Sequence, residues 1–186
     1  NKECFQIKIV LKINHETKTI CNNILKKINL GTRGNRTDGT PDQQLTGLIG
    51  EIGLLQFIGR NVPSYNNGIR GHDLVINDSK LDVKTMTRTV TMQPHYVHNL
   101  IGLQKNNITD GYIFCSYNMK QSELEICGYT SKKDFFDNAL FYMEGDVRER
   151  DNGTKFKTFT DLYEIGNEKL TEINSKDDIL SIKLLT

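Results

Sequence analysis

The chain has 186 residues, of which 37% are hydrophobic and 25% are charged, and its formal net charge is +1. These values predict one globular domain and exclude a disordered chain. The sequence has no apolar run of about 18 residues and no signal-peptide pattern, so we expect no membrane span and a cytoplasmic location. The four cysteines lack CxxC spacing, which favours buried thiols in a reducing compartment over disulfides or zinc ligands.

Charge is unevenly distributed along the chain. Residues 1–45 contain eight Lys or Arg against four Asp or Glu, whereas residues 131–186 contain nine against twelve. A basic N-terminal third suits a phosphate backbone. A mixed solvated surface explains the same count equally well.

The first elements predicted along the chain are a strand and a helix. Residues 5–13 are strand-like, and residues 16–30 have apolar side chains at helical spacing. Residues 31–44 are rich in Gly, Thr, Asn and Asp and predict a loop, which carries Arg33 and Arg36.

The next helix, predicted at residues 46–59, is apolar around almost its whole circumference. A helix of this kind is buried. Gly47, Gly50 and Gly53 recur every three residues and leave a smooth strip that a sheet can approach closely.

Glu51 stands out on this helix, because at 100° per residue it lies between Ile58 and Leu55 on an apolar face. Burial of an unpaired carboxylate costs several kcal/mol, so we expect a compensating partner such as a metal ion. The alternatives are that Glu51 escapes at a helix end or pairs with an arginine.

A β-hairpin is predicted next, with one strand at residues 73–76, a turn at residues 77–80 and a second strand opening at residues 81–85. Side chains alternate along a strand, so Asp82 and Lys84 share one face. The apolar side chains between them take the other face, toward a core.

The hairpin brings Asp73 up to Asp82 and Lys84. Two carboxylates beside a lysine provide ligands for a hard metal ion and a partner for a phosphate. Gly68 and Gly71 free the backbone just before this point. The alternative is that Asp82 and Lys84 are ordinary solvated residues.

Basic and imidazole side chains follow the hairpin. If its second strand continues to residue 90, Arg88 extends the Asp82 face and is either a phosphate contact or a solvated edge residue. Residues 91–99 predict a loop, in which His95 and His98 face a substrate or solvent more readily than a metal. Lys105 lies in a predicted helical turn.

The rest of the chain alternates between apolar and charged segments. A buried central strand is predicted at residues 111–117, a neighbouring strand at 124–129, a helix from 131 to 143, a charged hairpin or loop at 145–157, and short terminal elements at 162–165 and 179–185. The fold class is therefore α/β (α+β), with a mixed central sheet of four to five strands flanked by helices.

This order of elements resembles the PD-(D/E)XK nuclease superfamily, which has the restriction-endonuclease-like fold. The motif stands here as Glu51, then His72-Asp73, then Asp82-Val83-Lys84 after eight intervening residues. His72 replaces the proline of the family name. The resemblance covers residues 42–143 of a single domain, and residues 1–41 and 144–186 are then appendages.

The resemblance implies a role for each motif residue. Asp73 and Asp82 bind a divalent metal together with the backbone carbonyl of Val83, and Glu51 binds a metal or its water from the helix side. Lys84 positions or deprotonates the attacking water, or steadies charge on the phosphate. Oxygen ligands select Mg²⁺ or Mn²⁺ over zinc.

The implied function is a Mg²⁺-dependent nuclease in a bacterial cell or phage-infected host, and most readily a DNA endonuclease of the restriction type or a phage DNA-processing enzyme. An RNase is the remaining alternative within this class. Cleavage of both strands of double-stranded DNA suits a homodimer. The expected nucleic-acid contacts are Arg33, Arg36, Arg88, His95 and Lys105. The alternative functions are a catalytically inactive nucleic-acid-binding module on the same fold and a domain in which Asp-x-Lys is accidental.

Overall fold

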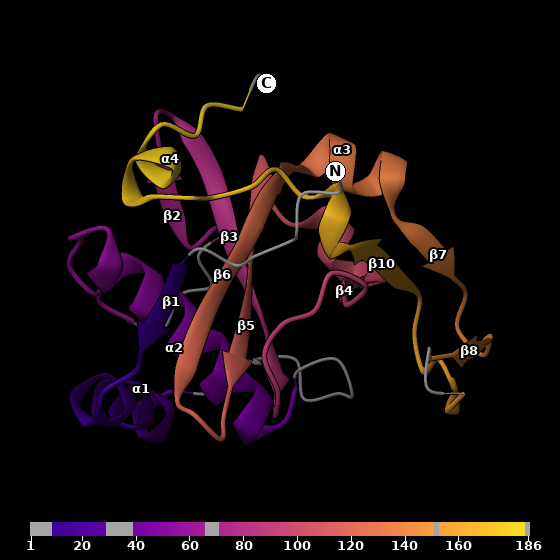
Figure 1. The fold of residues 1–186 in the computed structure, drawn as a ribbon, viewed down its shortest axis with the longest axis horizontal. Coiled ribbons are helices and arrows are strands. Elements are labelled where there is room, and N and C mark those ends of the chain that lie inside the picture. Colours follow the sequence, from indigo (N-terminus) through magenta and orange to yellow (C-terminus); the bar gives the residue numbers. More distant parts are fainter. Residues whose placement is uncertain (1–8, 29–38, 66–70, 151–152, 185–186) are drawn as a thin grey trace, which may run out of the picture.

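The computed structural model describes residues 9–28, 39–65, 71–150 and 153–184. Its helices and strands follow in the order shown in Figure 1. They are β1 (Ile9–Lys12), α1 (His15–Lys27), α2 (Pro41–Phe57), β2 (Leu74–Ile76), β3 (Ser79–Arg88), β4 (Val97–Ile101), η1 (Gly102–Asn106), β5 (Gly111–Asn118), β6 (Glu123–Ser131), α3 (Lys132–Asn138), β7 (Leu140–Tyr142), β8 (Val147–Glu149), β9 (Lys155–Lys157), β10 (Leu162–Gly166), η2 (Asn167–Lys169) and α4 (Lys176–Leu180).

The main sheet is mixed and has five strands in the order β1-β6-β5-β3-β2. Strands β3 and β5 are parallel, with Leu81 opposite Gly111, and the other pairs are antiparallel. A second sheet has the order β4-β10-β7, and β8 and β9 form a separate ribbon. The predicted α/β class and the mixed sheet are confirmed, whereas the sequence did not predict the second sheet.

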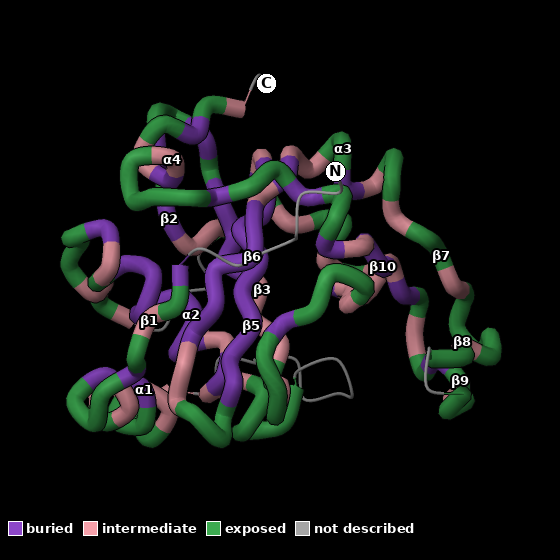
Figure 2. Tube along the Cα trace, in the orientation of Figure 1, coloured by how far each residue is buried: buried purple, intermediate pink, exposed green. Residues whose placement is uncertain are grey.

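The main sheet is covered on both faces. One apolar cluster joins the sheet to α1, α2 and α4, and includes Leu81 and Val83 of β3. A second cluster joins the opposite face to β4, α3 and β10, through Tyr112 and Phe114 of β5. Figure 2 shows the central strands buried, whereas β7, β8 and β9 are largely exposed at the right of the view. The face that carries Asp82 therefore lies under a second layer.

Helix α2 begins at Pro41, inside the segment predicted as a loop. The Thr40 side chain accepts a hydrogen bond from the Gln43 N–H at 3.3 Å, and the Gln43 side chain accepts one from the Thr40 N–H at 2.8 Å. This capping box and the proline in the first turn start the helix earlier than its apolar pattern indicates. The predicted start at residue 46 is wrong for this reason.

The β2–β3 hairpin has a two-residue turn at Asn77 and Asp78, whose φ values are 45° and 66°. Two successive positive φ values are typical of the type I′ turn, which matches the twist of paired strands. The predicted turn at residues 77–80 is too long, because Ser79 already pairs with Ile76. Strand β3 continues to Arg88, as expected if the second strand is long.

Two later predictions need correction. Residues 97–99 belong to β4 rather than to a loop, and His98 is fully buried with its Nε2 2.9 Å from Asn167 Oδ1. The helix predicted to reach residue 143 ends at Asn138, because Leu140 pairs with Glu164 of β10. The hairpin expected at residues 145–157 is present as β8 and β9.

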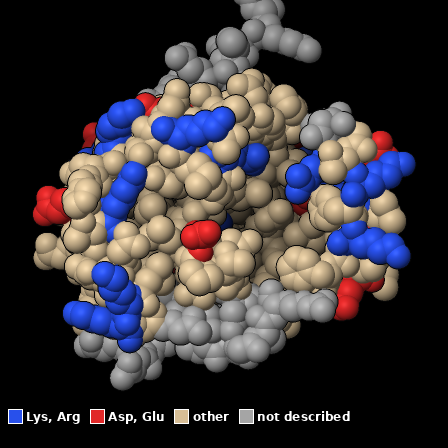
Figure 3. Space-filling model, turned by 90° about the horizontal axis from the view of Figure 1, so that it is seen from below, with Lys and Arg blue, Asp and Glu red and all other residues tan. Residues whose placement is uncertain are grey.

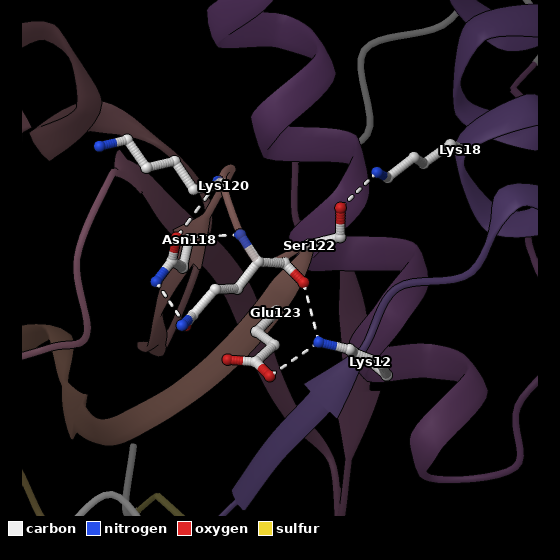
Figure 4. Close-up of polar contacts among 7 residues, drawn as sticks. Lys12, Lys18, Asn118, Lys120, Ser122 and Glu123 are labelled. Carbon is white, nitrogen blue, oxygen red and sulfur yellow. Dashed lines mark hydrogen bonds and ion pairs between the residues drawn. The ribbon is translucent and has the colours of Figure 1, made fainter.

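The turn between β5 and β6 is fastened to the N-terminal elements (Figure 4). Lys12 of β1 donates to the Gln121 carbonyl at 3.0 Å and pairs with Glu123 at 2.9 Å. Lys18 of α1 donates to the Ser122 hydroxyl at 2.6 Å. These contacts hold α1 against the edge of the main sheet.

The cysteines of the described residues are free thiols, as expected. Cys21, Cys115 and Cys127 are all buried, and Cys4 lies outside the described residues. Burial raises the pKa of Cys21 to about 11 and that of Cys115 to about 12. Across the ranges that the structure describes, we find no helix with the length and apolarity needed to span a membrane.

Candidate active site

The β2–β3 hairpin places Asp73 beside the segment that carries Asp82. Leu74 is paired with Leu81. Asp73 and Asp82 are the next residues along the two paired segments, on the side away from the turn, and therefore lie opposite each other. The Asp73 N–H donates to the Leu81 carbonyl at 2.9 Å, and Asp73 Oδ2 accepts from the Val83 N–H at 2.7 Å. The Asp73 carboxylate is therefore fixed to the backbone of the Asp82-Val83-Lys84 motif.

Asp82 and Lys84 form an ion pair, with 3.1 Å between Oδ2 and Nζ. Asp82 is only 3% exposed, and the Lys84 side chain is 20% exposed. The alternative of an ordinary solvated face is therefore wrong for Asp82. Removal of the Asp82 charge from water costs several kcal/mol, and the neighbouring Lys84 ammonium offsets part of this cost.

Tyr112 lies next to Asp82 on the neighbouring parallel strand. Its ring packs 5.4 Å from that of Phe135 in α3, and its buried hydroxyl has no hydrogen-bond partner among the described residues. Burial and the negative charge of Asp82 both raise the pKa of Tyr112. The phenol therefore stays neutral beside the carboxylate.

Glu51 is buried in the middle of α2, as its apolar face predicts. Escape at a helix end is therefore wrong as an explanation of this residue. Its charge contributes, after burial, to the raised pKa of Cys21 in α1. Within the ranges that the structure describes, no three His, Cys, Asp or Glu side chains are grouped closely enough to hold a metal ion. Glu51 as a third ligand stays a prediction.

The predicted nucleic-acid contacts fall in different places. The Arg88 guanidinium donates to the Val97 carbonyl at 2.8 Å and lies 4.5 Å from the Tyr96 ring centroid, so it ties β3 to β4. Lys105 lies 5.2 Å from the Phe136 ring, on the side of α3. The predictions for Arg33 and Arg36 lie outside the described residues.

His95 is exposed and lines a groove of about 740 Å³ beyond the end of β3. One wall comes from the end of β3 and the start of β4, and the other from the β8–β9 ribbon. The lining residues are Met86, Thr87, Arg88, Thr89, Val90, His95, Tyr96, Val97, Asn99, Arg148, Arg150, Phe156 and Glu164. Figure 3 shows a hollow between the main body and a lobe at the right, with Lys and Arg side chains on both sides.

Sequence reasoning missed the individual groove residues of the ribbon, which are Arg148, Arg150 and Phe156. The available signal was their alternation with other charged residues in a segment already predicted as a hairpin. This alternation predicts on which face of the hairpin each side chain lies, but it does not predict which other element packs against that face.

A comparison of the chain with protein-family models, curated proteins and solved structures finds no significant match. The resemblance to PD-(D/E)XK nucleases therefore depends on the motif residues and the order of elements.

Proposed function

We propose that this protein is a metal-dependent phosphodiesterase of the PD-(D/E)XK type, and specifically a Mg²⁺- or Mn²⁺-dependent DNA endonuclease. One observation carries the proposal: the Asp73 carboxylate is hydrogen-bonded to Val83 N–H in the same motif where the buried Asp82 forms an ion pair with the partly exposed Lys84. The order α2, β2, β3, β5, β6, α3, interrupted only by β4 of the second sheet and η1, also supports it, as does the direct passage of β6 into α3 at Ser131.

The donors of this hairpin fit a hard cation. Asp73, Asp82 and the Val83 carbonyl would hold the ion, and they offer only oxygen, which suits Mg²⁺ and Mn²⁺. Glu51 is carried by α2, which packs against the Leu81 and Val83 face of the sheet rather than the Asp82 face, so its role as a ligand stays a prediction. The metal, when bound, supplies charge neutralisation and a more acidic water. The buried position of Asp82 keeps bulk water from competing with these interactions.

Lys84 serves as the cationic partner of the phosphate in this proposal. The Lys84 ammonium is held 3.1 Å from the Asp82 carboxylate, which fixes its position at the motif. It is well suited to orient a phosphate and to stabilise negative charge that develops on it. Double-stranded DNA as the substrate, and a homodimer that cuts both strands, belong to the same proposal.

The test is incubation with supercoiled plasmid in Mg²⁺, Mn²⁺ or EDTA, beside Asp82→Asn and Lys84→Met. We expect nicking or linearisation by the wild type that requires metal and is lost in both variants. Asp78→Asn and Lys80→Ala are matched controls, because both residues are exposed and belong to the same hairpin. Circular dichroism and thermal melting confirm that each variant is folded.

Two results would overturn the nuclease. Metal-dependent cleavage that survives in both site variants would remove this active site. A folded wild type that binds DNA without metal and cleaves neither plasmid, RNA nor branched DNA would identify the inactive binding module instead.

A further inference from the structure

The groove beyond β3 continues the face that carries the proposed active site. Lys84, Met86 and Arg88 alternate with residues of the opposite face, and the last two line the groove. Arg88 lies four positions after Lys84, which corresponds to about 13 Å along a strand at about 3.3 Å per residue. This distance equals about four base-pair steps of about 3.4 Å in duplex DNA.

The β8–β9 ribbon turns one defined face toward the groove. Arg148 is paired with Phe156 across the ribbon, and both line the groove together with Arg150. Lys155 and Lys157 alternate with Phe156 and are exposed away from the groove. The inward face therefore carries two guanidinium groups around one aromatic ring.

The arginines of the groove differ in the contacts that they make within the protein. Arg148 Nε donates to the buried Glu164 carboxylate at 2.6 Å, which fastens the ribbon to β10. Arg88 is held by the Val97 carbonyl and the Tyr96 ring.

Arg150 is exposed, and its guanidinium lies 5.0 Å from the Phe156 ring centroid. Within the described part of the chain, no carboxylate forms an ion pair with Arg150. Arg150 is therefore the cation of this groove that is available to an external anion.

We infer that this groove binds one phosphodiester strand of the substrate about two to four nucleotides from the scissile phosphate, with Arg150 as the phosphate contact. The inference rests on the proposed function for the position of the cleaved bond. A guanidinium stacked on an aromatic ring is suited to a phosphate with an adjacent base, because it combines a planar donor fork with a stacking surface. His95 on the opposite wall gives the same strand a second polar contact.

The test measures binding separately from cleavage. Fluorescence anisotropy in EDTA, across a series of salt concentrations, compares the wild type with Arg150→Ala on labelled single-stranded and double-stranded DNA. Lys157→Ala is the matched control, because it removes one positive charge from the outward face of the same ribbon. Arg150→Ala should weaken binding severalfold and lower the slope of log K against log salt by about 0.7–0.9, whereas Lys157→Ala should leave both unchanged.

A larger effect on single-stranded DNA would assign the groove to an unpaired strand, and an equal effect would assign it to one strand of a duplex. The proposed role of the groove would be overturned if Arg150→Ala bound DNA with wild-type affinity. It would also be overturned if Lys157→Ala lost as much affinity for DNA as Arg150→Ala. These outcomes are independent of cleavage, so a wild type that binds through Arg150 but never cleaves would contradict the proposed function alone. If Asp82→Asn lost cleavage but Arg150→Ala still bound DNA as the wild type does, the proposed active site would stand and only the role of the groove would be contradicted.

Discussion

Gly50 of α2 lies directly against Thr85 of β3. A Cβ built on Gly50 would overlap the Thr85 hydroxyl and would lie 2.8 Å from the Thr85 Cβ. The helix can approach this strand only because position 50 has no side chain. The contact sets the distance between α2, which carries Glu51, and β3, which carries Asp82 and Lys84.

We expect Gly50→Ala to destabilise the protein by about 1–3 kcal/mol, because the added methyl group forces the helix away from the sheet. Gly47→Ala is the control, since nothing lies within 4 Å of a Cβ at that position of the same helix. It should stabilise the protein by about 0.5–1 kcal/mol through the gain in helix propensity. Urea unfolding of both variants measures the difference, and equal stabilities would contradict the close approach.

The buried His98 should make stability depend on pH. Burial lowers its pKa from 6.5 to about 4. The unfolded chain therefore binds a proton that the native state excludes between these two values, and stability falls as pH drops from about 6.5 to about 4. The loss attributable to His98 is about 1.4 kcal/mol per pH unit in this window and should be absent above it.

Chemical unfolding at pH 7.5, 6.0 and 5.0 tests this dependence on pH. A His98→Gln variant should lose most of the slope between pH 6.0 and 5.0, whereas the exposed His95→Asn should keep it. A slope that is unchanged in His98→Gln would assign the acid sensitivity to other groups.

Tyr112→Phe should be neutral or stabilising by up to about 1 kcal/mol, because the hydroxyl that it removes is buried without a partner among the described residues. Thermal melting measures the change, and cleavage of plasmid is the second readout. A lower melting temperature would show that the hydroxyl makes a stabilising contact. A loss of cleavage at full stability would place the phenol in the reaction beside Asp82.

Millimolar Mg²⁺ should raise the melting temperature of the wild type, because a ligand of the native state stabilises it by about 2.7 kcal/mol at a hundred times its Kd. Asp82→Asn should lose this shift, and Asp78→Asn in the turn of the same hairpin should retain it. Differential scanning fluorimetry with Mg²⁺, Ca²⁺ and EDTA makes the comparison. An equal shift in all three proteins would indicate that the ion binds elsewhere.

The parts of the candidate site that sequence reasoning predicted are those set by local chemistry. Asn77-Asp78 favours a tight turn, and alternation along β3 then places Asp82 and Lys84 on one face opposite Val83. The burial of Glu51 followed from the apolar circumference of its helix.

The errors arose where distant segments decide the structure. His98 lies in a polar stretch that resembles a loop, but Val97–Ile101 becomes a strand because it pairs with Leu162–Gly166 far along the chain. Leu140 leaves the predicted helix for the same reason, since Glu164 is its partner. The groove depends on both pairings, so no local pattern could predict its walls.

The two-residue turn at Asn77 and Asp78 also has a consequence for the order of events as the chain folds. A hairpin closes in about 1–10 μs, whereas the parallel pairing of β3 with β5 must wait for a long connection to close. We expect Asp73 to meet the Val83 amide early, and pulsed hydrogen exchange should find that amide protected before that of Asn167, which donates to the distant Tyr96 carbonyl at 3.1 Å. Asp73 and Asp82 would then be brought together before α2 and the groove take their places around the hairpin.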